Sequence, residues 1–398
     1  MRQKTKRAIC VISILAVIFV VVALCFDSIL NAVINLTAGK ELPQLAGEAE
    51  VGEWYAIDID EAVSSDGSKW QGYFRKGSEN KVVLYFYGGG FSVNEYTAAR
   101  SMDVEGGFYN PRLNTGLNVM TTAIWKWGIG NAAEDNILKD WTFIGVPYCN
   151  GDFHAGAGEK EYTALDGSTK TIHYNGYTNY RRLVTKVFDY IDSSPDQLLI
   201  TGSSAGGFGA AILADDAIAL FNDPQDVTVL VDSSLLITKD WHDIMVNEWH
   251  SPQKFSDVVA TDNITLDSLA ALHSKRDNVK ILFDCSVRDY NLAMAQRFFD
   301  EGAQQEMPLE IGKAEGDRFQ QILKKMVADM QEKIPGCGIY IWDEETQADG
   351  HLTVHTAAGT KIFFDSESRN PSLAQWLENA VNGNVESFGL ELLDRDYE

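Results

Sequence analysis

Short runs of apolar, β-branched and aromatic residues recur along the chain after residue 80, and most are apolar at every position. A strand with one solvated face alternates apolar and polar residues, whereas a strand buried on both faces is apolar throughout. The pattern therefore predicts a parallel sheet covered on both faces, with strands at 81–87, 141–148, 197–201, 226–231, 279–286 and 338–342.

Between these runs, apolar residues return at spacings of three and four, which is the period of an amphipathic helix. The segments 178–193 and 317–334 show this pattern most clearly, and 371–382 predicts a final helix around Trp376. Strands that alternate with helices are typical of the α/β class. We expect a doubly wound, mostly parallel sheet with cover helices.

One segment, 238–268, interrupts this alternation. It contains Trp241, Trp249 and two histidines but no strong strand pattern. Aromatic insertions above the strand ends often form a lid or a substrate wall. Plain packing of the two tryptophans explains the composition equally well, so both interpretations stay open.

The N-terminus carries an apolar run of 19 residues, 8–26, directly after a basic segment, 1–7. As a helix, the run would be about 28 Å long, which is close to the hydrocarbon thickness of a bilayer. Cations on the N-terminal side predict that residues 1–7 stay in the cytoplasm and that the rest is exported. We expect a transmembrane signal anchor, with a cleaved signal peptide and secretion as the alternative.

After this anchor we expect a linker at 27–47 and one catalytic domain at 48–398. Four of the 33 basic residues lie in 1–7, so the exported part carries 29 basic against 57 acidic residues. Such a negative field opposes binding of nucleic acid and favours a neutral substrate. The three cysteines of this part form no disulfide or zinc pattern, and we expect a monomer without cofactor or metal.

The predicted strand 197–201 runs directly into Gly202-Ser203-Ser204-Ala205-Gly206 and then into an apolar helix pattern. This is the strand, tight turn and helix of a nucleophile elbow, in which small neighbours allow a sharp turn that exposes the serine hydroxyl. The motif predicts Ser204 as a nucleophile in an α/β-hydrolase fold. A plain glycine turn is the weaker interpretation.

A nucleophilic serine needs a base, which in this fold comes late in the chain. Past residue 286 the only histidines are His351 and His355. We choose His351 because it follows a flexible Asp-Gly in a loop, whereas His355 leads toward the next regular segment. A metal site at this i, i+4 pair is a remote alternative, since no His-Glu-x-x-His motif is present.

The acid that orients the base should follow the strand 279–286. Asp284 lies inside the apolar run, whereas Asp289 follows it on a turn into a helix pattern. A loop carboxylate can reach an imidazole, so we choose Asp289 and leave Asp284 as a buried structural acid.

Donors for an oxyanion are predicted at a glycine-rich loop after the first long apolar run, Tyr87-Gly88-Gly89-Gly90-Phe91. Backbone amides can converge in such a loop, and the amide of Ala205 would supply a further donor. A simple turn is the alternative interpretation of the glycines.

Taken together, the motifs resemble those of the pectin acetylesterase and Notum carboxylesterase family. They appear in order as Tyr87-Gly-Gly-Gly-Phe91, Val146-Pro-Tyr-Cys-Asn-Gly-Asp152 with His154 and Gly156, Gly202-Ser-Ser-Ala-Gly-Gly207, and Asp232-Ser-Ser. The resemblance covers about residues 80–385. Phe91 stands where some relatives have tryptophan, and the extra disulfide cysteines of plant and animal members are missing.

The resemblance implies metal-free hydrolysis of an O-acyl ester, usually acetate on an extracellular polysaccharide. It implies a triad of Ser204, Asp289 and His351, and an oxyanion hole made by the amides of Gly89, Gly90 and Ala205. Phe91, Asp152 and His154 would contact the substrate. The alternatives are a lipid or lipopeptide deacylase of the same fold and a catalytically silent glycan-binding protein.

Overall fold

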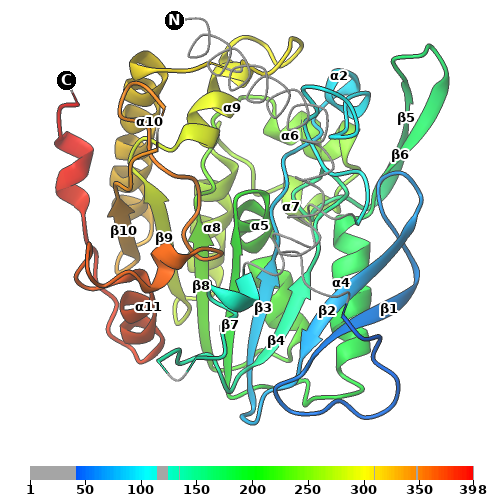
Figure 1. Ribbon diagram of the computed structural model, residues 1–398, viewed down its shortest axis with the longest axis vertical. Coiled ribbons are helices and arrows are strands. Elements are labelled where there is room, and N and C mark those ends of the chain that lie inside the picture. Colours follow the sequence, from blue (N-terminus) through cyan, green and yellow to red (C-terminus); the bar gives the residue numbers. More distant parts are fainter. Residues whose placement is uncertain (1–41, 114–123, 134, 309, 347, 398) are drawn as a thin grey trace, which may run out of the picture.

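The structure is a computed structural model that describes residues 42–113, 124–133, 135–308, 310–346 and 348–397 (Figure 1). Within these ranges, no helix is both long enough and apolar enough to cross a membrane. The predicted anchor at 8–26 and the basic segment before it lie outside the described residues, as do residues 27–41 of the predicted linker.

An eight-stranded sheet forms the centre of the described chain, in the spatial order β1-β2-β4-β3-β7-β8-β9-β10. The first pairs, β1 with β2 and β2 with β4, are antiparallel, and all later neighbours are parallel. The mostly parallel sheet predicted from the sequence is therefore confirmed. The strands are β1 (Trp54–Val63), β2 (Lys69–Arg75), β3 (Lys81–Phe86), β4 (Thr142–Val146), β7 (Gln197–Ser203), β8 (Asp226–Asp232), β9 (Lys280–Ser286) and β10 (Gly338–Trp342).

The central strands end in register at one edge of the sheet. Phe86 of β3 pairs with Gly202 of β7, Ser203 of β7 pairs with Asp232 of β8, and Asp232 pairs with Asp284 of β9. Parallel strands place all their carboxyl ends at the same edge, which is where open α/β sheets bind ligands. The loops that leave these ends carry the candidate site.

One face of the sheet is covered by a row of helices that contact one another in sequence. Tyr180 of the first helix donates a hydrogen bond of 2.7 Å to Asp216 of the second, and the second, third and fourth then pack side by side. A shorter helix, α9 (Tyr290–Asp300), packs against the last of the row. The row consists of α4 (Gly176–Val187), α5 (Ala205–Leu220), α8 (Ile264–Lys275) and α10 (Lys313–Lys333).

In the spatial order of the strands, the step from β3 to β4 goes toward β1. The later crossovers, from β7 to β8, β8 to β9 and β9 to β10, go in the opposite direction. Right-handed crossovers therefore place the connection from β3 to β4 on the other face. There, residues 135–138 lie beside η2 (Lys361–Phe364) and α11 (Leu373–Val381), which contacts β8. With both faces covered, β4 and β10 are buried along their whole length, as their continuous apolar sequences predict.

The remaining elements are short and lie around the carboxyl ends of the strands. A separate hairpin stands away from the main sheet on the side of β1 (Figure 1). These elements are α2 (Glu95–Ala98), the hairpin strands β5 (Gly158–Thr163) and β6 (Thr169–Tyr174), α6 (Trp241–Asp243), η1 (Ile244–Glu248), α7 (Gln253–Ser256) and η3 (Leu390–Asp394).

The insertion predicted at 238–268 contains α6, η1, α7 and the start of α8. Trp241 and Trp249 are fully buried, and the Trp249 indole donates a hydrogen bond of 2.6 Å to the carbonyl of Ser92. Trp241 packs on Phe153, Phe208 and Phe299. The tryptophans therefore belong to the core beneath the site, which favours packing over a lid.

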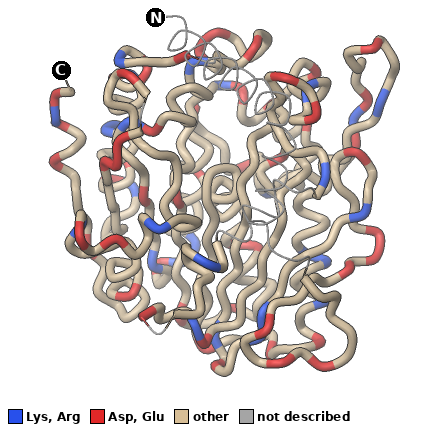
Figure 2. Tube along the Cα trace, in the orientation of Figure 1, with Lys and Arg blue, Asp and Glu red and all other residues tan. Residues whose placement is uncertain are grey.

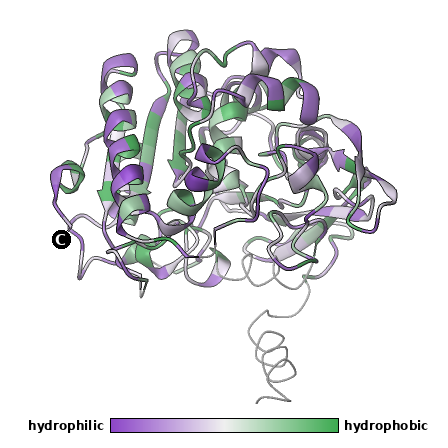
Figure 3. Cartoon of the chain, turned by 90° about the horizontal axis from the view of Figure 1, so that it is seen from above, coloured by the Kyte–Doolittle hydropathy of each residue, from purple (hydrophilic) through white to green (hydrophobic). Residues whose placement is uncertain are grey.

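Polar and apolar residues separate as expected for this architecture. Charged residues lie mainly on loops and outer helix surfaces, and the middle of the sheet is almost free of them (Figure 2). Hydrophobic residues concentrate on the strands and on the helix sides that face them (Figure 3). Burial of these apolar surfaces supplies the main stabilisation of the fold.

Candidate active site

Ser204 occupies the turn between β7 and α5. Its backbone has φ +57° and ψ −127°, a conformation that non-glycine residues rarely adopt. The glycines around it let the chain fold back on itself, since a Cβ on Gly202 would lie 2.3 Å from the carbonyl oxygen of Gly206, and one on Gly206 would lie 1.9 Å from that of Phe86. The structure thus builds the strained elbow that the motif predicts.

A cavity of about 470 Å³ opens beside Ser204. Its wall includes a few polar residues, such as Asn110, Asn291 and Thr360, but most of the described side chains that line it are apolar. The apolar side chains are Phe91, Met102, Phe108, Ile124, Phe153, Phe208, Leu236, Leu292, Met294, Ala295 and Met307. The cavity can therefore hold an apolar group against the serine.

Gly89, Gly90 and Ala205 also line this cavity. Within the described chain, none of their amides donates a hydrogen bond to another protein group. Gly90 has φ +83°, and a Cβ there would lie 1.8 Å from the carbonyl oxygen of Phe108, so only glycine fits. The loop after β3 and the start of α5 thus border the same cavity as Ser204, and backbone amides are the donors that an oxyanion hole uses.

Asp289 and His355 form a hydrogen-bonded pair. Asp289 Oδ2 lies 2.7 Å from His355 Nδ1, and Asp289 Oδ1 accepts a hydrogen bond of 2.9 Å from the amide of Leu292 at the start of α9. Asp289 is fully buried, and the His355 side chain is 14% exposed. His355 lines the cavity together with Ser204, so the imidazole that is bonded to Asp289 and the serine border the same cavity.

The environment of His355 raises its pKa above the ordinary 6.5. Burial of the ring alone lowers the pKa because the charged form loses its solvation. The negative charge of Asp289, the hydrogen bond that this carboxylate accepts from the ring and the negative charge of Asp232 act in the opposite direction and outweigh burial. The site therefore stabilises an imidazolium, which a general base becomes once it has accepted a proton.

His351 lies elsewhere, and this corrects the choice made from the sequence. Its ring contacts Glu345, with Nδ1 3.2 Å from Oε1, and packs near Tyr397. Its side chain is 44% exposed, and it is not among the described residues that line the cavity. The segment from His351 to His355 is not helical, so the two rings do not form the i, i+4 pair of the metal alternative.

The backbone explains why His355 is the histidine that reaches the acid. Thr353 and Asp289 form a parallel β-bridge, in which the amide of Tyr290 donates to the carbonyl of Thr353 and that of Thr353 donates to the carbonyl of Arg288. The bridge aligns the two loops so that the residue two positions after Thr353 faces Asp289. The sequence shows neither the bridge nor its register.

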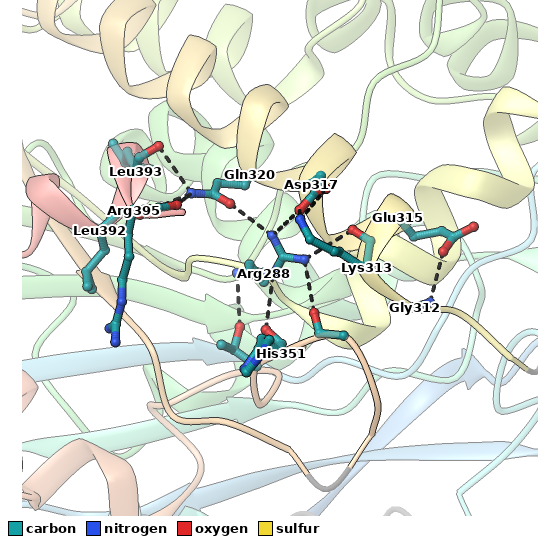
Figure 4. Close-up of polar contacts among 12 residues, drawn as sticks. Arg288, Gly312, Lys313, Glu315, Asp317, Gln320, His351, Leu392, Leu393 and Arg395 are labelled. Atoms are coloured by element: carbon teal, nitrogen blue, oxygen red, sulfur yellow. Dashed lines mark hydrogen bonds and ion pairs between the residues drawn. The ribbon is translucent and has the colours of Figure 1, made fainter. Parts of the chain in front are cut away.

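Arg288 fastens these loops to α10 (Figure 4). Its buried guanidinium donates to the carbonyls of His351 and Gly350 and to that of Lys313, at 3.0–3.1 Å. It also bonds Asp317 at 2.7 Å and Gln320 at 3.0 Å. The loop that leads to His355 is thus held by the residue next to Asp289.

Among the predicted substrate contacts, Phe91 lines the cavity, but Asp152 and His154 lie behind its wall. His154 Nε2 donates to the carbonyl of Tyr87 at 2.9 Å, directly before the glycine loop. Burial lowers the pKa of His154 to about 4, although the bond to Tyr87 opposes this, so the ring is neutral. His154 supports the glycine loop, and its neighbour Phe153 lines the cavity.

Asp152 supports the same region from inside the core. Its carboxylate accepts hydrogen bonds from the amides of His154, at 3.1 Å, and Gly176, at 2.8 Å. Burial raises the pKa of Asp152 to about 7, against the opposing effect of these bonds.

The sheet order and the strained elbow at Ser204 match the α/β-hydrolase fold. More narrowly, the chain belongs to the pectinacetylesterase family, whose model matches residues 54–298. The predicted family is therefore confirmed. A search of curated proteins finds no match.

Two solved structures of the Wnt deacylase Notum from Drosophila have a similar fold. The first superposes with a TM-score of 0.55 at 14% identity over 81% of this chain and 91% of Notum. The second gives a TM-score of 0.55 at 12% identity over 83% of this chain and 94% of Notum. At such identities the likeness concerns the fold alone.

Proposed function

We propose that this protein is a serine carboxylesterase in which Ser204 is the nucleophile, His355 the general base and Asp289 the residue that orients the base. The observation that carries the proposal is the 2.7 Å bond between Asp289 and His355 at the wall of the cavity that also exposes Ser204. Family membership supports an ester hydrolase.

The proposed reaction has two steps. His355 accepts the proton of the Ser204 hydroxyl while the oxygen attacks the acyl carbonyl, and the amides of Gly89, Gly90 and Ala205 hold the charge that develops. The alcohol leaves with the proton from His355, and water then releases the acyl group from Ser204 by the same route. Asp289 holds the imidazole with Nδ1 protonated, so that Nε2 can act as the base.

The cavity supports an acyl group longer than acetyl. Its volume of about 470 Å³ lies within the range of sites that hold whole small molecules, and an acetyl group would leave most of its aromatic and methionine lining without a contact. The structural neighbour is named as a deacylase, which agrees with this substrate class. We therefore place a fatty or otherwise extended acyl ester first.

The second candidate is an O-acetyl ester on a polysaccharide, which the name of the matching family favours. On this alternative, the cavity would hold parts of the sugar beside the acetyl group. In either case, we propose that the enzyme acts outside the cytoplasm, because residues 1–26 read as an export signal or anchor.

The test uses p-nitrophenyl esters from acetate through butyrate and octanoate to palmitate. Ser204→Ala should lower turnover of every ester by about 10⁴-fold or more, as removal of a triad serine does in other hydrolases. Unchanged turnover in this variant would refute the nucleophile. For the acyl group, kcat/KM should rise from acetate to octanoate, whereas a preference for acetate would favour the second candidate.

A variant of the cavity wall separates these candidates further. Ala295 lies on α9 and lines the cavity, so Ala295→Phe fills space that only a long acyl chain needs. We expect it to reduce octanoate hydrolysis at least about tenfold, the effect of a few lost methylene contacts, with acetate hydrolysis as the internal control. An equal loss on both esters would argue against an acyl-chain site.

A further inference from the structure

A second carboxylate, Asp232 at the end of β8, lies beneath the elbow and the histidine loop. It is fully buried. Its Oδ2 accepts hydrogen bonds from the hydroxyl of Ser203 at 2.8 Å and from the amides of Ala357 and Ala358 at 3.1 and 2.8 Å. Its Oδ1 also accepts from the amide of Ala357 at 3.2 Å.

These partners flank two residues of the proposed triad. Ser203 directly precedes Ser204, and Ala357 follows His355 by two positions. The backbone of Asp232 adds a further contact, because its carbonyl accepts a hydrogen bond of 2.9 Å from the amide of Ser204. A single residue on β8 is therefore joined to both the serine turn and the histidine loop.

We propose that Asp232 is a positioning residue of the esterase site, which fixes the loop of His355 against the turn of Ser204 and adds a second negative charge behind the imidazole. The proposal rests on the function proposed above and adds to the Ser204–His355–Asp289 constellation a residue that touches no substrate. Asp232 is not among the described residues that line the cavity, so it acts only through its neighbours.

The carboxyl of Asp284 lies next to that of Asp232 but is neutral. Asp284 pairs with Asp232 across β8 and β9, is fully buried and accepts a hydrogen bond of 3.2 Å from the Trp342 indole. Burial and then the charge of Asp232 raise the pKa of Asp284 well above its usual range. A raised pKa favours the protonated form of a carboxyl, so Asp284 is neutral at neutral pH.

The charges that act on His355 come from two elements. Asp289 at the start of α9 and Asp232 at the end of β8 both raise the pKa of His355. Asp284 on β9 is neutral, and Tyr85 on β3, which bonds Ser203 at 2.7 Å, keeps its proton because burial raises its pKa far above neutrality. The guanidinium of Arg288 is directed to Asp317 and Gln320. Removal of the Asp232 charge must therefore lower the pKa of His355.

The experiment compares Asp232→Asn with Asp284→Asn in the full-length protein. The two changes are chemically identical and lie side by side in the same buried pair, but only the first removes a charge. For Asp232→Asn we expect kcat to fall roughly 10- to 100-fold, the cost of a misplaced catalytic group, while KM changes less than about threefold because no substrate contact is lost. The acidic limb of the kcat/KM profile should move to lower pH.

For Asp284→Asn, the acidic limb should stay where it is in the wild type, since replacing a neutral carboxyl with an amide removes no charge. A limb that does not move in Asp232→Asn, or that moves equally in both variants, would overturn the proposal. If Ser204→Ala abolishes turnover while Asp232→Asn behaves as wild type, only the role of Asp232 fails. If Ser204→Ala remains active, the proposed function itself fails.

A measurement on the wild-type protein covers the case in which Asp232→Asn does not fold. The amides of Ala357 and Ala358 both donate to the buried carboxylate, so they should exchange hydrogen slowly although they lie in a loop. Exchange of these two amides at the rate of an unprotected loop would contradict the proposed contact.

Discussion

At the residue scale, His351 and His355 have different environments, so substitution of each serves as a control for the other. His355 is bonded to buried Asp289, whereas His351 contacts Glu345 and is 44% exposed. We expect His355→Ala to lower kcat by about 10⁴-fold or more. His351→Ala should change kcat less than about threefold, since a surface substitution away from special features has small effects. Ester hydrolysis by both variants checks this, and a greater loss in His351→Ala would reverse the assignment.

The raised pKa of His355 predicts the pH dependence of the reaction. The base must be neutral to accept the Ser204 proton, so activity is absent well below the pKa and rises as pH increases through it. Because the pKa lies above 6.5, the midpoint of the acidic limb of kcat/KM should also lie above pH 6.5. A midpoint at or below 6.5 would show that the two anions do not act on the imidazole as described.

Part of this site follows from local sequence, and part does not. The elbow at Ser204 and the glycine loop at Gly89 and Gly90 are local backbone features, so their motifs are informative. The choice between His351 and His355 depends on the bridge between Thr353 and Asp289, which joins residues far apart in the chain. The same holds for the burial of His154 behind the glycine loop.

At the element scale, Arg288 joins the loop before His355 to α10, since its side chain bonds the carbonyl of His351 and, on α10, the carbonyl of Lys313 and the amide oxygen of Gln320 (Figure 4). Arg288→Met leaves several buried acceptors without a donor. We expect a loss of about 3–5 kcal/mol in the free energy of unfolding, since each acceptor that loses its donor away from water costs roughly 1–3 kcal/mol, measured by urea denaturation.

The matched control for this variant is Arg318→Met, an exposed arginine on α10. Arg318 is paired with Asp300 at 3.4 Å, and its side chain is 55% exposed, so its loss should change stability by less than about 0.5 kcal/mol. Equal effects of the two substitutions would contradict the central position of Arg288.

The predicted elements differ in how well the sequence reveals them. The inner strands were visible because burial on both faces makes them continuously apolar, as in β4 and β10. The hairpin strand β5 alternates between half-buried and exposed residues, and its sequence Gly-Glu-Lys-Glu-Tyr-Thr carries no apolar run. The packing of 238–268 depends on distant partners such as Phe153 and Ser92, which no local pattern specifies.

At the scale of the whole molecule, acidic residues exceed basic ones by 24, and they are distributed over the outer surface (Figure 2). This field repels polyanions and has no effect on neutral esters, and salt screens it with a Debye length of about 10 Å at 0.1 M. Any hydrolysis of acetylated pectin should therefore increase between low and moderate ionic strength, while that of acetylated xylan stays nearly constant. Equal salt responses would show that the surface charge does not control access.

The central claim is that Ser204, His355 and Asp289 form one catalytic unit at the wall of an apolar cavity. The most direct test is labelling with a fluorophosphonate followed by peptide mass spectrometry, in wild-type protein and in the variants His355→Ala and His351→Ala. We predict a covalent adduct on Ser204 in the wild type and in His351→Ala, and almost none in His355→Ala, because only His355 activates the hydroxyl. Labelling of His355→Ala at the wild-type rate, or an adduct on another residue, would contradict the account.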